Sequence, residues 1–508
     1  MLKRITAIAL CLILTASFTG CKSGLNNKDN GQNGSSVGNA DNGQSGSKKE
    51  EAKFDYTDPS IYTIDAMVSM GIEEPKTADA EIEKAADAKL KKIMDNPDTL
   101  KPKEGGKYIY VGNGGTDGKG YGLEPDKPFE TIEYAGLVAK AGDVVLLRRG
   151  DFWRTQVYIK EGVSYGAYGK GNKPTIYGST RDVASQDWEK VNKNIYKTQS
   201  GTGSDIGLLV FNHGKATGSK KRWEQELEKD FDFYCSGGYI YLYYSKGNPK
   251  NKFKSVEVCP TQSIVKMPSN STIQNWRVMY GGAHGISMSH AQNVTIDGCV
   301  IGYIGGGFQV NSVWGPHTRY GNGIEVWGEC DGYTVTNCHV FQCYDTGITM
   351  QYETNKEEDV YIKNVLFKDN LLEYNNYNIE YFLKANNETN SKMQNILIQN
   401  NILRYGGFGW GFHSRPDRSY GTCVMSFPIT EMENFVYKNN IFDRGSCMIL
   451  IMIADKKGNF PKFMGNTYAQ TEKKSVLEKQ GQPFNFKSGG DKVVTEIIGD
   501  KTGKIIKY

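Results

Sequence analysis

The sequence predicts an all-β solenoid, because one short pattern returns several times from about residue 271. Each repeat has a strand rich in β-branched residues, a polar bend, an apolar pair and a strand containing glycine. The bends read IDGCVI, VTNCHVF, FKDNLL, IQNNIL and YKNNIF, and aligning them gives one column: Cys299, Cys338, Asn370, Asn401 and Asn440. The interval between repeats varies while the pattern does not, which is typical of stacked coils with loops of different length.

The strand after each bend supplies a second column and assigns the faces. The segments HGISMS, NGIEVW, TGITMQ, NIEYF and GWGFH align Ile286, Ile324, Ile348, Ile379 and Trp410. Side chains alternate between the two faces of a strand, so this column is expected inside the solenoid. The residues two places later are also expected inside: Met288, Val326, Met350, Tyr381 and Phe412. The residues between them are expected in solvent on the outer face: Ser287, Glu325, Thr349, Glu380 and Gly411.

The bend column combines asparagine with two cysteines. Asparagine suits such a bend because it tolerates a left-handed backbone and can hydrogen-bond to its neighbours in a stacked ladder. Cys299 and Cys338 are expected to be small buried residues of the same column and not a disulfide.

With its NN bends and stacked xGIxx strands, the segment from about 271 to 450 resembles the right-handed parallel β-helix of the pectin-lyase-like superfamily. The resemblance extends to YIYVGNGGTDGKG and DKPFETIEYAGLVAKAGDVVLLRRGDF, which look like the capping strand and helix that open many extracellular β-helix enzymes. It implies three strands per coil, with catalysis on the strand that follows the third strand. This fold hosts lyases, hydrolases, esterases and adhesins, so the resemblance leaves the reaction open.

The chain begins with a targeting segment. Residues 1–20 have the basic start, apolar run and small residues of an export signal, and the residues before Cys21 resemble a bacterial lipobox in which that cysteine is lipidated. Residues 21–52, rich in Gly, Asn and Ser, are expected to form a disordered linker. We therefore expect a secreted protein, lipid-anchored at Cys21 to the outer face of the bacterial cell membrane.

The rest of the chain divides by composition. Residues 53–104 are expected to be partly helical, with a helix at about 78–96, and the β-helix is expected over 105–470. Residues 203–262 interrupt it with hairpin-like alternation, which predicts a small β insertion. Residues 471–508 are expected to form a C-terminal cap.

Charge and cysteine usage exclude several classes of function. Lys and Arg number 61 against 57 Asp and Glu, and a net charge of +4 on 508 residues is weak for a nucleic-acid-binding protein. No basic run is interleaved with aromatic residues, so no nucleic-acid partner is expected. The cysteines lack zinc-ligand spacing, and beyond the export signal no apolar run is long enough to cross a bilayer.

Glu325 and Glu380 are the predicted catalytic pair. They share the outward column two coils apart with Thr349 between them, and at roughly 4.8 Å per coil their backbones would lie about 10 Å apart. Inverting glycosidases hold two carboxyl groups about 6.5–9.5 Å apart, so that one protonates the leaving oxygen while the other activates water. Asp345, at the start of the intervening coil, is a third catalytic candidate. Solvated surface glutamates are the alternative interpretation.

Loop lengths predict a groove beside these residues. Cys299 and Ile324 are 25 residues apart, whereas Cys338 and Ile348 are only 10 apart, so about 15 extra residues must loop out. Longer loops are also expected at the other edge of the strand face. Residues on loops of a rigid scaffold often carry function. The small residues before each isoleucine are expected to leave a bare strip that a ligand can approach: Gly285, Gly323, Gly347 and Asn378.

The remaining candidates are substrate contacts. Trp327 and Phe382 are expected to be outward aromatics suited to stacking on sugar rings, although either could cover the base of a loop instead. His284 is equally suited to a packed position. The other polar candidates border the same face: Gln351, His317, Arg319, His413 and Lys384.

Three classes of function remain open. A glycoside hydrolase needs no cofactor. A polysaccharide lyase would use Glu325 and Glu380 as Ca²⁺ ligands, with Lys384 or Arg319 as the base, and the segment NIEYFLK resembles the Glu-plus-Lys arrangement of some β-helix lyases. A non-catalytic, glycan-binding surface protein would keep Trp327 without using the glutamates. In each class the partner is a carbohydrate polymer or oligosaccharide.

Overall fold

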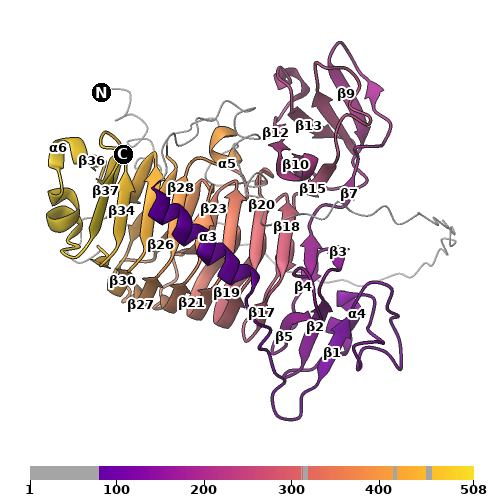
Figure 1. The fold of residues 1–508 in the computed structure, drawn as a ribbon, viewed down its shortest axis with the longest axis horizontal. Coiled ribbons are helices and arrows are strands. Elements are labelled where there is room, and N and C mark those ends of the chain that lie inside the picture. The colour runs from indigo at the N-terminus through magenta and orange to yellow at the C-terminus, as the bar shows by residue number, and fades with distance from the viewer. Residues whose placement is uncertain (1–78, 311, 313–317, 416–419, 453–459) are drawn as a thin grey trace. The chain divides into compact units, whose positions relative to one another are not determined.

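The computed structural model describes residues 79–508, apart from residues 311, 313–317, 416–419 and 453–459. The expected export signal, Cys21, the expected linker over 21–52 and His317 therefore lie outside the described residues. Parallel strands are stacked in three columns along the solenoid (Figure 1). The predicted fold class, a right-handed parallel β-helix, is confirmed.

The first stack contains the strand that begins each coil. Its strands are β4 (Val157–Tyr158), β16 (Val265–Lys266), β19 (Ile286–Asp297), β21 (Ile324–Thr336), β23 (Thr346–Glu353), β26 (Tyr377–Lys384), β29 (Thr422–Ile429), β32 (Cys447–Ile451) and β35 (Ser475–Lys479). Their register aligns Ile286, Ile324, Ile348 and Ile379, all of them fully buried. A fully buried isoleucine contributes about 1.5–3 kcal/mol, so this column stabilises the stack in the predicted register.

The column continues at Val424, not at Trp410. Val424 pairs with Ile379, and Ile449 and Leu477 follow in the next coils. Trp410 and Phe412 lie instead in the short helix α5 (Trp410–His413), which the chain forms before it reaches β29. The prediction for GWGFH was wrong, because the true strand TCVMSFPI starts thirteen residues after the start of this segment, which has a similar alternation.

The second stack shares β19 and β21, which are long enough to enter both stacks. Its other strands are β1 (Tyr108–Val111), β2 (Val144–Arg148), β5 (Ser164–Tyr168), β17 (Thr272–Gln274), β24 (Tyr361–Lys368), β27 (Lys392–Gln399), β30 (Met432–Lys438) and β33 (Lys462–Met464). The helix α4 (Ile132–Val138) packs near β1 and β2 and, with them, forms the N-terminal strand and helix implied by the resemblance.

The third stack completes each coil. Its strands are β3 (Phe152–Arg154), β6 (Thr175–Tyr177), β18 (Arg277–Gly281), β20 (Val300–Ile304), β22 (His339–Cys343), β25 (Leu371–Glu373), β28 (Ile402–Gly406), β31 (Ile441–Gly445), β34 (Thr467–Gln470) and β37 (Lys504–Lys507). The predicted C-terminal segment thus supplies strands to the stacks: β35 pairs with β32, β37 pairs with β34, and β36 (Gln482–Asn485) pairs antiparallel with β35. The helices α6 (Phe486–Gly489) and η4 (Val493–Ile498) lie between β36 and β37.

In the bend before the third stack, one asparagine takes the left-handed backbone and the next one forms the hydrogen-bond ladder. Asn400 and Asn439 take the left-handed backbone, with φ of 57° and 54°. Asn401 and Asn440, the predicted column, instead form the ladder: Asn440 Oδ1 accepts from Asn401 N at 2.9 Å and from Asn401 Nδ2 at 3.0 Å. The ladder begins at Cys299, whose N–H donates to the sulfur of Cys338, and both thiols are free as expected.

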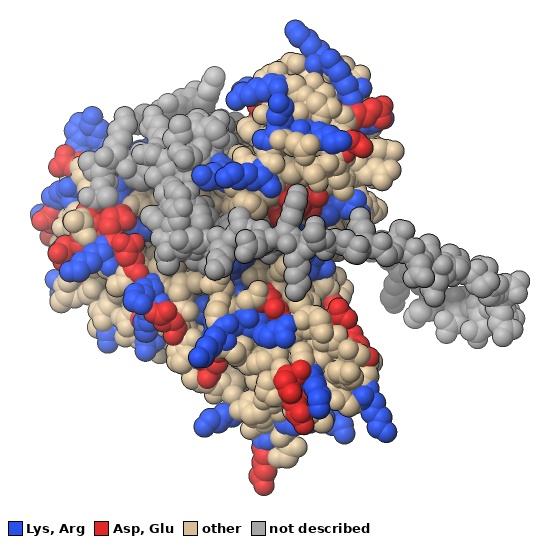
Figure 2. Space-filling model, turned by 45° about the vertical axis from the view of Figure 1, so that its right-hand side comes forward, with Lys and Arg blue, Asp and Glu red and all other residues tan. Residues whose placement is uncertain are grey.

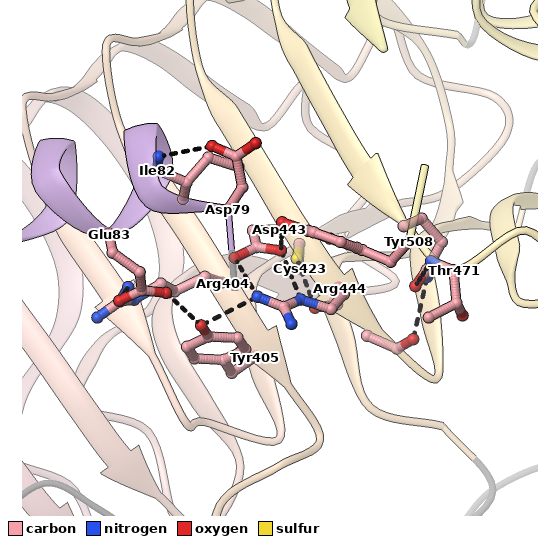
Figure 3. Close-up of polar contacts among 12 residues, drawn as sticks. Asp79, Ile82, Glu83, Arg404, Tyr405, Cys423, Asp443, Arg444, Thr471 and Tyr508 are labelled. Atoms are coloured by element: carbon pink, nitrogen blue, oxygen red, sulfur yellow. Dashed lines mark hydrogen bonds and ion pairs between the residues drawn. The ribbon is translucent and has the colours of Figure 1, made fainter. Parts of the chain in front are cut away.

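The helix expected at about 78–96 is observed as α3 (Ala80–Met94), and Asp79 caps its first turn. It lies across the outer face of the third stack (Figure 1), where Ala86 and Ile93 pack against strand residues. Figure 3 shows that Glu83, on this helix, reaches Arg404 and Tyr405 on β28. No helix in the described part of the chain is long and apolar enough to cross a membrane.

The β insertion contains two sheets and starts earlier than the predicted residue 203. One sheet holds β7 (Arg181–Asp182), β10 (Ile206–Phe211), β11 (Ala216–Thr217) and β15 (Val256–Pro260). The other holds β8 (Glu189–Lys190), β9 (Ile195–Gln199), β12 (Ser219–Lys220), β13 (Asp232–Ser236) and β14 (Tyr239–Tyr243). Two short helices, η2 (Asn212–Gly214) and η3 (Glu224–Glu226), complete it. The sheets enclose their own core, with Phe233, Ile240 and Leu242 fully buried.

Acidic and basic side chains are interspersed over much of the face drawn in Figure 2. This distribution fits the near-balance of charges in the sequence.

Candidate active site

The candidate site lies where the chain turns from the third stack into the first. Two neighbouring coils turn here within a few residues, at residues 344–345 and 374–376. The coils on either side make long connections, at residues 305–323 and 407–421, of which 311, 313–317 and 416–419 are not described. The first long connection was predicted from the sequence. The second was missed, because Trp410 had been placed in the strand.

The predicted relation between Glu325 and Glu380 agrees with the observed register. Ile324 pairs with Ile348, and Thr349 pairs with Glu380, so Glu325, Thr349 and Glu380 occupy successive rungs. With strands roughly 4.8 Å apart, the two glutamate backbones are separated by about 10 Å. Their exposure differs from the prediction: the side chain of Glu325 is 13% exposed, and Glu380 and Thr349 are buried. Neither glutamate is a solvated surface group.

Glu325 is surrounded by hydrogen-bond donors. His284 Nε2 lies 3.0 Å from Glu325 Oε2, while Asn322 Nδ2 and Gln351 Nε2 donate to Oε1 at 3.3 and 3.4 Å. The N–H of Asn322 donates to His284 Nδ1 at 3.3 Å. Because Nδ1 accepts this bond, the imidazole proton is on Nε2 and points at the carboxylate. His284 and Gln351 thus both orient Glu325 in this structure.

Glu380 has a very different environment. Its Oε2 accepts a hydrogen bond from Thr346 Oγ1 at 2.7 Å, and the side chain is buried. Burial, together with the negative charges of Asp345 and Glu325, raises the pKa of Glu380 to about 8. The Thr346 hydroxyl and the positive charge of Arg415 oppose this rise without cancelling it. Glu380 is therefore protonated at neutral pH.

Asp345 lies on the short turn before β23 and is paired with Arg415. Arg415 Nη2 contacts Asp345 Oδ1 and donates to the carbonyl of Tyr344 at 3.1 Å. The guanidinium also lies over the rings of Tyr344 and Tyr377, 4.7 and 5.7 Å from their centroids. The negative charge of Asp345 is close enough to Glu380 to raise the pKa of Glu380. The ion pair holds the Arg415 cation beside Asp345.

The predicted aromatic contacts form a row. Trp327 is 38% exposed, and its ring meets Phe382 edge-on with centroids 5.9 Å apart. Phe382 is buried between Trp327 and Phe427, so it supports Trp327 from below. Of the two aromatics, Trp327 is the one with an accessible face.

Other candidates lie away from the glutamates. Lys384, at the far end of β26, is paired with Glu353 at 2.6 Å. His413 lies in α5 against Phe412 and not on a strand of the first stack. Arg319 donates to the carbonyl of Lys220 in the insertion at 3.0 Å, and its guanidinium lies over Phe308 and Tyr344. Arg319 thus joins the long connection to the insertion.

The glycine strip was assigned to the wrong face. A Cβ added to Gly323 would come within 2.5 Å of Val340 Cγ1 and 3.0 Å of Cys343 Sγ, inside the solenoid. A Cβ on Gly285 would lie 2.9 Å from Ile301 Cγ2. These glycines leave room where the first and third stacks meet, and they offer no surface to a ligand.

Sequence reasoning missed two residues of the site, Thr346 and Asn322, and it missed the ion pair between Asp345 and Arg415. Thr346 and Asn322 precede strand columns that had been identified, so a search for polar residues at the start of each strand would have found them. Arg415 is 70 residues from Asp345, and no periodic signal relates the two. Among the described residues, no group of three or more His, Cys, Asp or Glu side chains is arranged to hold a metal ion.

Comparison with known proteins gives structural matches alone. No protein-family model and no curated protein matches the chain. A glycoside hydrolase shares 9% identity over 79% of this chain and 96% of its own, with a TM-score of 0.44. XylC in complex with xylose shares 13% over 79% and 82%, with a TM-score of 0.37, and pectate lyase Pel9A shares 10% over 77% and 83%, with a TM-score of 0.40. At these values the matches carry no argument about the reaction.

Proposed function

We propose that the chain is a glycoside hydrolase in which Glu380 is the general acid and Glu325 the general base. The observation that carries this proposal is the different environment of two carboxyl groups two coils apart. Glu380 is buried and keeps its proton, whereas hydrogen-bond donors reach both oxygens of Glu325. Paired carboxyl groups with separated roles are what glycosidic hydrolysis requires.

In the proposed step, Glu380 Oε–H gives its proton to the glycosidic oxygen while the bond from that oxygen to the anomeric carbon breaks. A water molecule attacks the anomeric carbon from the other face and loses a proton to Glu325. The backbone separation of about 10 Å favours the inverting arrangement, in which the carboxyl groups must leave room for this water. Trp327, with its accessible face on the same strand as Glu325, would stack on a neighbouring sugar ring.

Asp345 has a supporting role in this proposal. Its charge favours the protonated form of Glu380. Arg415 forms its ion pair with Asp345, and among the described residues the hydrogen bond to the Glu380 carboxyl group comes from the Thr346 hydroxyl. Turnover should therefore persist at neutral pH and fall as pH rises through about 8, where Glu380 loses its proton.

The experiment compares Glu380→Gln and Glu325→Gln with Glu353→Gln, a glutamate of β23 that is paired with Lys384. Each of the first two changes should lower the release of reducing ends from a panel of plant and host glycans by about 10²–10⁴-fold. Glu353→Gln should leave it nearly unchanged. Near-full hydrolysis by both variants would reject the pair and make Asp345 the next candidate.

The lyase interpretation is less well supported by these residues. A Ca²⁺ site needs ionised carboxylates, but Glu380 holds a proton and Glu325 is occupied by N–H donors. Of the two candidate bases, Lys384 is paired with Glu353, and Arg319 donates to the carbonyl of Lys220. Products that absorb in the ultraviolet, formed only with Ca²⁺, would nevertheless replace hydrolysis by elimination. Glycan binding with neither product would favour the non-catalytic interpretation.

We also propose that the enzyme acts outside the cell, anchored through a lipid on Cys21. The lipobox-like residues before Cys21 and the polar composition of 21–52 support this placement. Cys21→Ser should release the protein from membranes while export continues. Unchanged membrane association would reject the anchor.

A further inference from the structure

The five-stranded sheet of the insertion has one face with no role in the candidate active site. Its inner face buries Phe233, Ile240 and Leu242. Because side chains alternate along a strand, the neighbouring tyrosines point the other way, and they are half-buried: Tyr234, Tyr239, Tyr241 and Tyr243. We call these four residues the tyrosine face.

The tyrosine face is ordered by contacts within the sheet. Tyr234 and Tyr241 are directly opposed, with ring centroids 5.7 Å apart. Lys197 is paired with Glu189 at 3.2 Å and lies over the ring of Tyr239 at 5.2 Å. Tyr239, Tyr241 and Tyr243 follow one another on β14 at steps of roughly 7 Å. The rings are thus held in a row by the strand itself.

A polar cleft continues this row at Tyr243. It has a volume of about 430 Å³, within the size range of small-ligand sites. Tyr243 and Ile195 are register partners and both line it. Its polar walls come from two segments of the insertion: Asn192, Lys193, Asn194, Glu224 and Gln225.

The chemistry of the cleft matches a neutral glycan. Planar amide and carboxylate groups can bond pairs of hydroxyl groups, and an aromatic face can cover the apolar side of a sugar ring. Asn194 Nδ2 donates to the Tyr243 hydroxyl at 2.8 Å, which fixes the ring at the mouth of the cleft. Trp223, 58% exposed, precedes Glu224 in the chain. Lys193 and Glu224 have opposite charges, so the walls do not favour an ionic ligand.

We propose that the tyrosine face and this cleft form a second glycan-binding site, separate from the candidate active site. It would bind a neutral polysaccharide chain, with sugar rings on the tyrosines and one residue in the cleft. The two sites share no residue. The insertion is linked to the long connection of the candidate site by the Arg319 to Lys220 hydrogen bond, so one polymer could be held near the site that acts on it.

The test uses the full chain with Glu380→Gln and affinity gel electrophoresis in soluble xylan, mixed-linkage β-glucan and galactan. At least one polysaccharide should retard the protein. Tyr241→Ala combined with Tyr243→Ala should weaken that retardation at least tenfold, whereas Tyr241→Phe should retain it because the ring remains. Tyr121→Ala is the matched control, since this tyrosine is 38% exposed and lies after β1, outside both the insertion and the first stack.

Trp327→Ala separates the two sites. Retardation that is lost in Trp327→Ala and kept in the double tyrosine variant would place binding in the candidate active site and overturn the second site. The absence of retardation by all three polysaccharides would also overturn it. Retained hydrolysis by Glu380→Gln would reject the proposed mechanism and leave the result for the tyrosine face unaffected.

Discussion

Glu373 and Glu380 lie seven residues apart on the successive strands β25 and β26, and both are buried on the outer side of the solenoid. Yet their proton affinities move in opposite directions. The pKa of Glu373 is lowered to about 2, and that of Glu380 is raised to about 8. The same degree of burial thus gives one carboxylate that stays ionised and one carboxylic acid that stays neutral.

The difference comes from the partners that reach each group. Burial by itself would raise the pKa of Glu373, but Arg404 and His339 outweigh it, with Arg404 Nε at 2.5 Å and His339 Nε2 at 2.8 Å. Glu380 receives only a hydroxyl, and Asp345 adds a like charge nearby. For Glu373, buried cations beside the carboxyl group outweigh burial and stabilise the anion, and Glu380 lacks such close partners.

Removing the cation from Glu373 should have the largest effect. Arg404 contacts both Glu373 and Glu83, so Arg404→Ala leaves the buried Glu373 with His339 as its remaining partner. We expect a loss of about 3–5 kcal/mol in the free energy of unfolding, measured by urea denaturation at pH 7. Lys91→Ala, which breaks the exposed pair with Asp95, should change stability little. Equal effects of the two changes would contradict this account of Glu373.

Glu380→Gln should stabilise the protein at alkaline pH. The folded pKa of about 8 exceeds the unfolded value, so stability is fully present below about pH 4.5 and is lost as pH rises through about 8. An amide does not titrate. The variant should gain on the order of a few kcal/mol over the unchanged protein at pH 9 and nothing at pH 4. Melting temperatures across this range measure the difference.

Glu373→Gln is the opposite case and a control for the previous prediction. Its folded pKa is depressed, so its contribution is present above the unfolded value near 4.5 and is lost as pH falls toward about 2. The variant should be less stable than the unchanged protein at pH 7, by a margin that shrinks on acidification. Parallel pH profiles for the two glutamine variants would refute the contrast between the sites.

Asp345→Asn should lower the pKa of Glu380. The substitution removes a nearby negative charge and frees Arg415 from its ion pair. We expect a fall of roughly one unit, or about 1.4 kcal/mol, which carbonyl infrared spectroscopy of the protonated carboxyl can follow. An unchanged or higher pKa would contradict the contribution assigned to the charge of Asp345.

Asp79→Ala should have the smallest effect. The Asp79 carboxylate accepts from the N–H groups of Glu81 and Ile82 at the start of α3, and the loss of such a cap costs about 1 kcal/mol. The helix presents Glu83 to Arg404, so faster amide exchange is expected in α3. No change is expected in the titration of Glu380. A change there would show that α3, on the third stack, is coupled to the candidate site on the first stack.

The sequence predicted the features that depend on local periodicity. The isoleucine column, the asparagine ladder and the successive rungs of Glu325, Thr349 and Glu380 all follow from alternation within a strand and repetition between coils. The prediction for Trp410 was wrong because GWGFH has the same alternation as the strands. The register depends on which residue pairs with Ile379, and that residue is Val424. A local pattern does not reveal that the chain makes a long connection, residues 407–421, before it forms the next strand.

Exposure and charge could not be predicted in the same way. Alternation placed Glu380 outward, correctly, but outward residues of a solenoid are covered by segments that arrive from elsewhere in the chain. The pKa of Glu380 depends on Asp345 and Arg415, which are 70 residues apart. The glycine strip failed for a related reason, since Gly285 and Gly323 lie where two stacks meet and not on a free strand face.

The asparagine ladder also gives the solenoid a direction. In each ladder asparagine the backbone N–H and Nδ2 donate to the side chain of the next coil, and Nδ2 also donates to a backbone carbonyl of the previous coil. Asn466 donates in the same way to Asp500, whose carboxylate can only accept. Asp500 ends the series because its carboxylate has no N–H group to donate to a further coil. A duplication that inserts a whole coil between Asn440 and Asn466 would preserve every donor and acceptor, whereas a coil appended beyond Asp500 would find no donor. A coil added in the middle of the solenoid therefore fits the ladder, whereas one added after Asp500 does not.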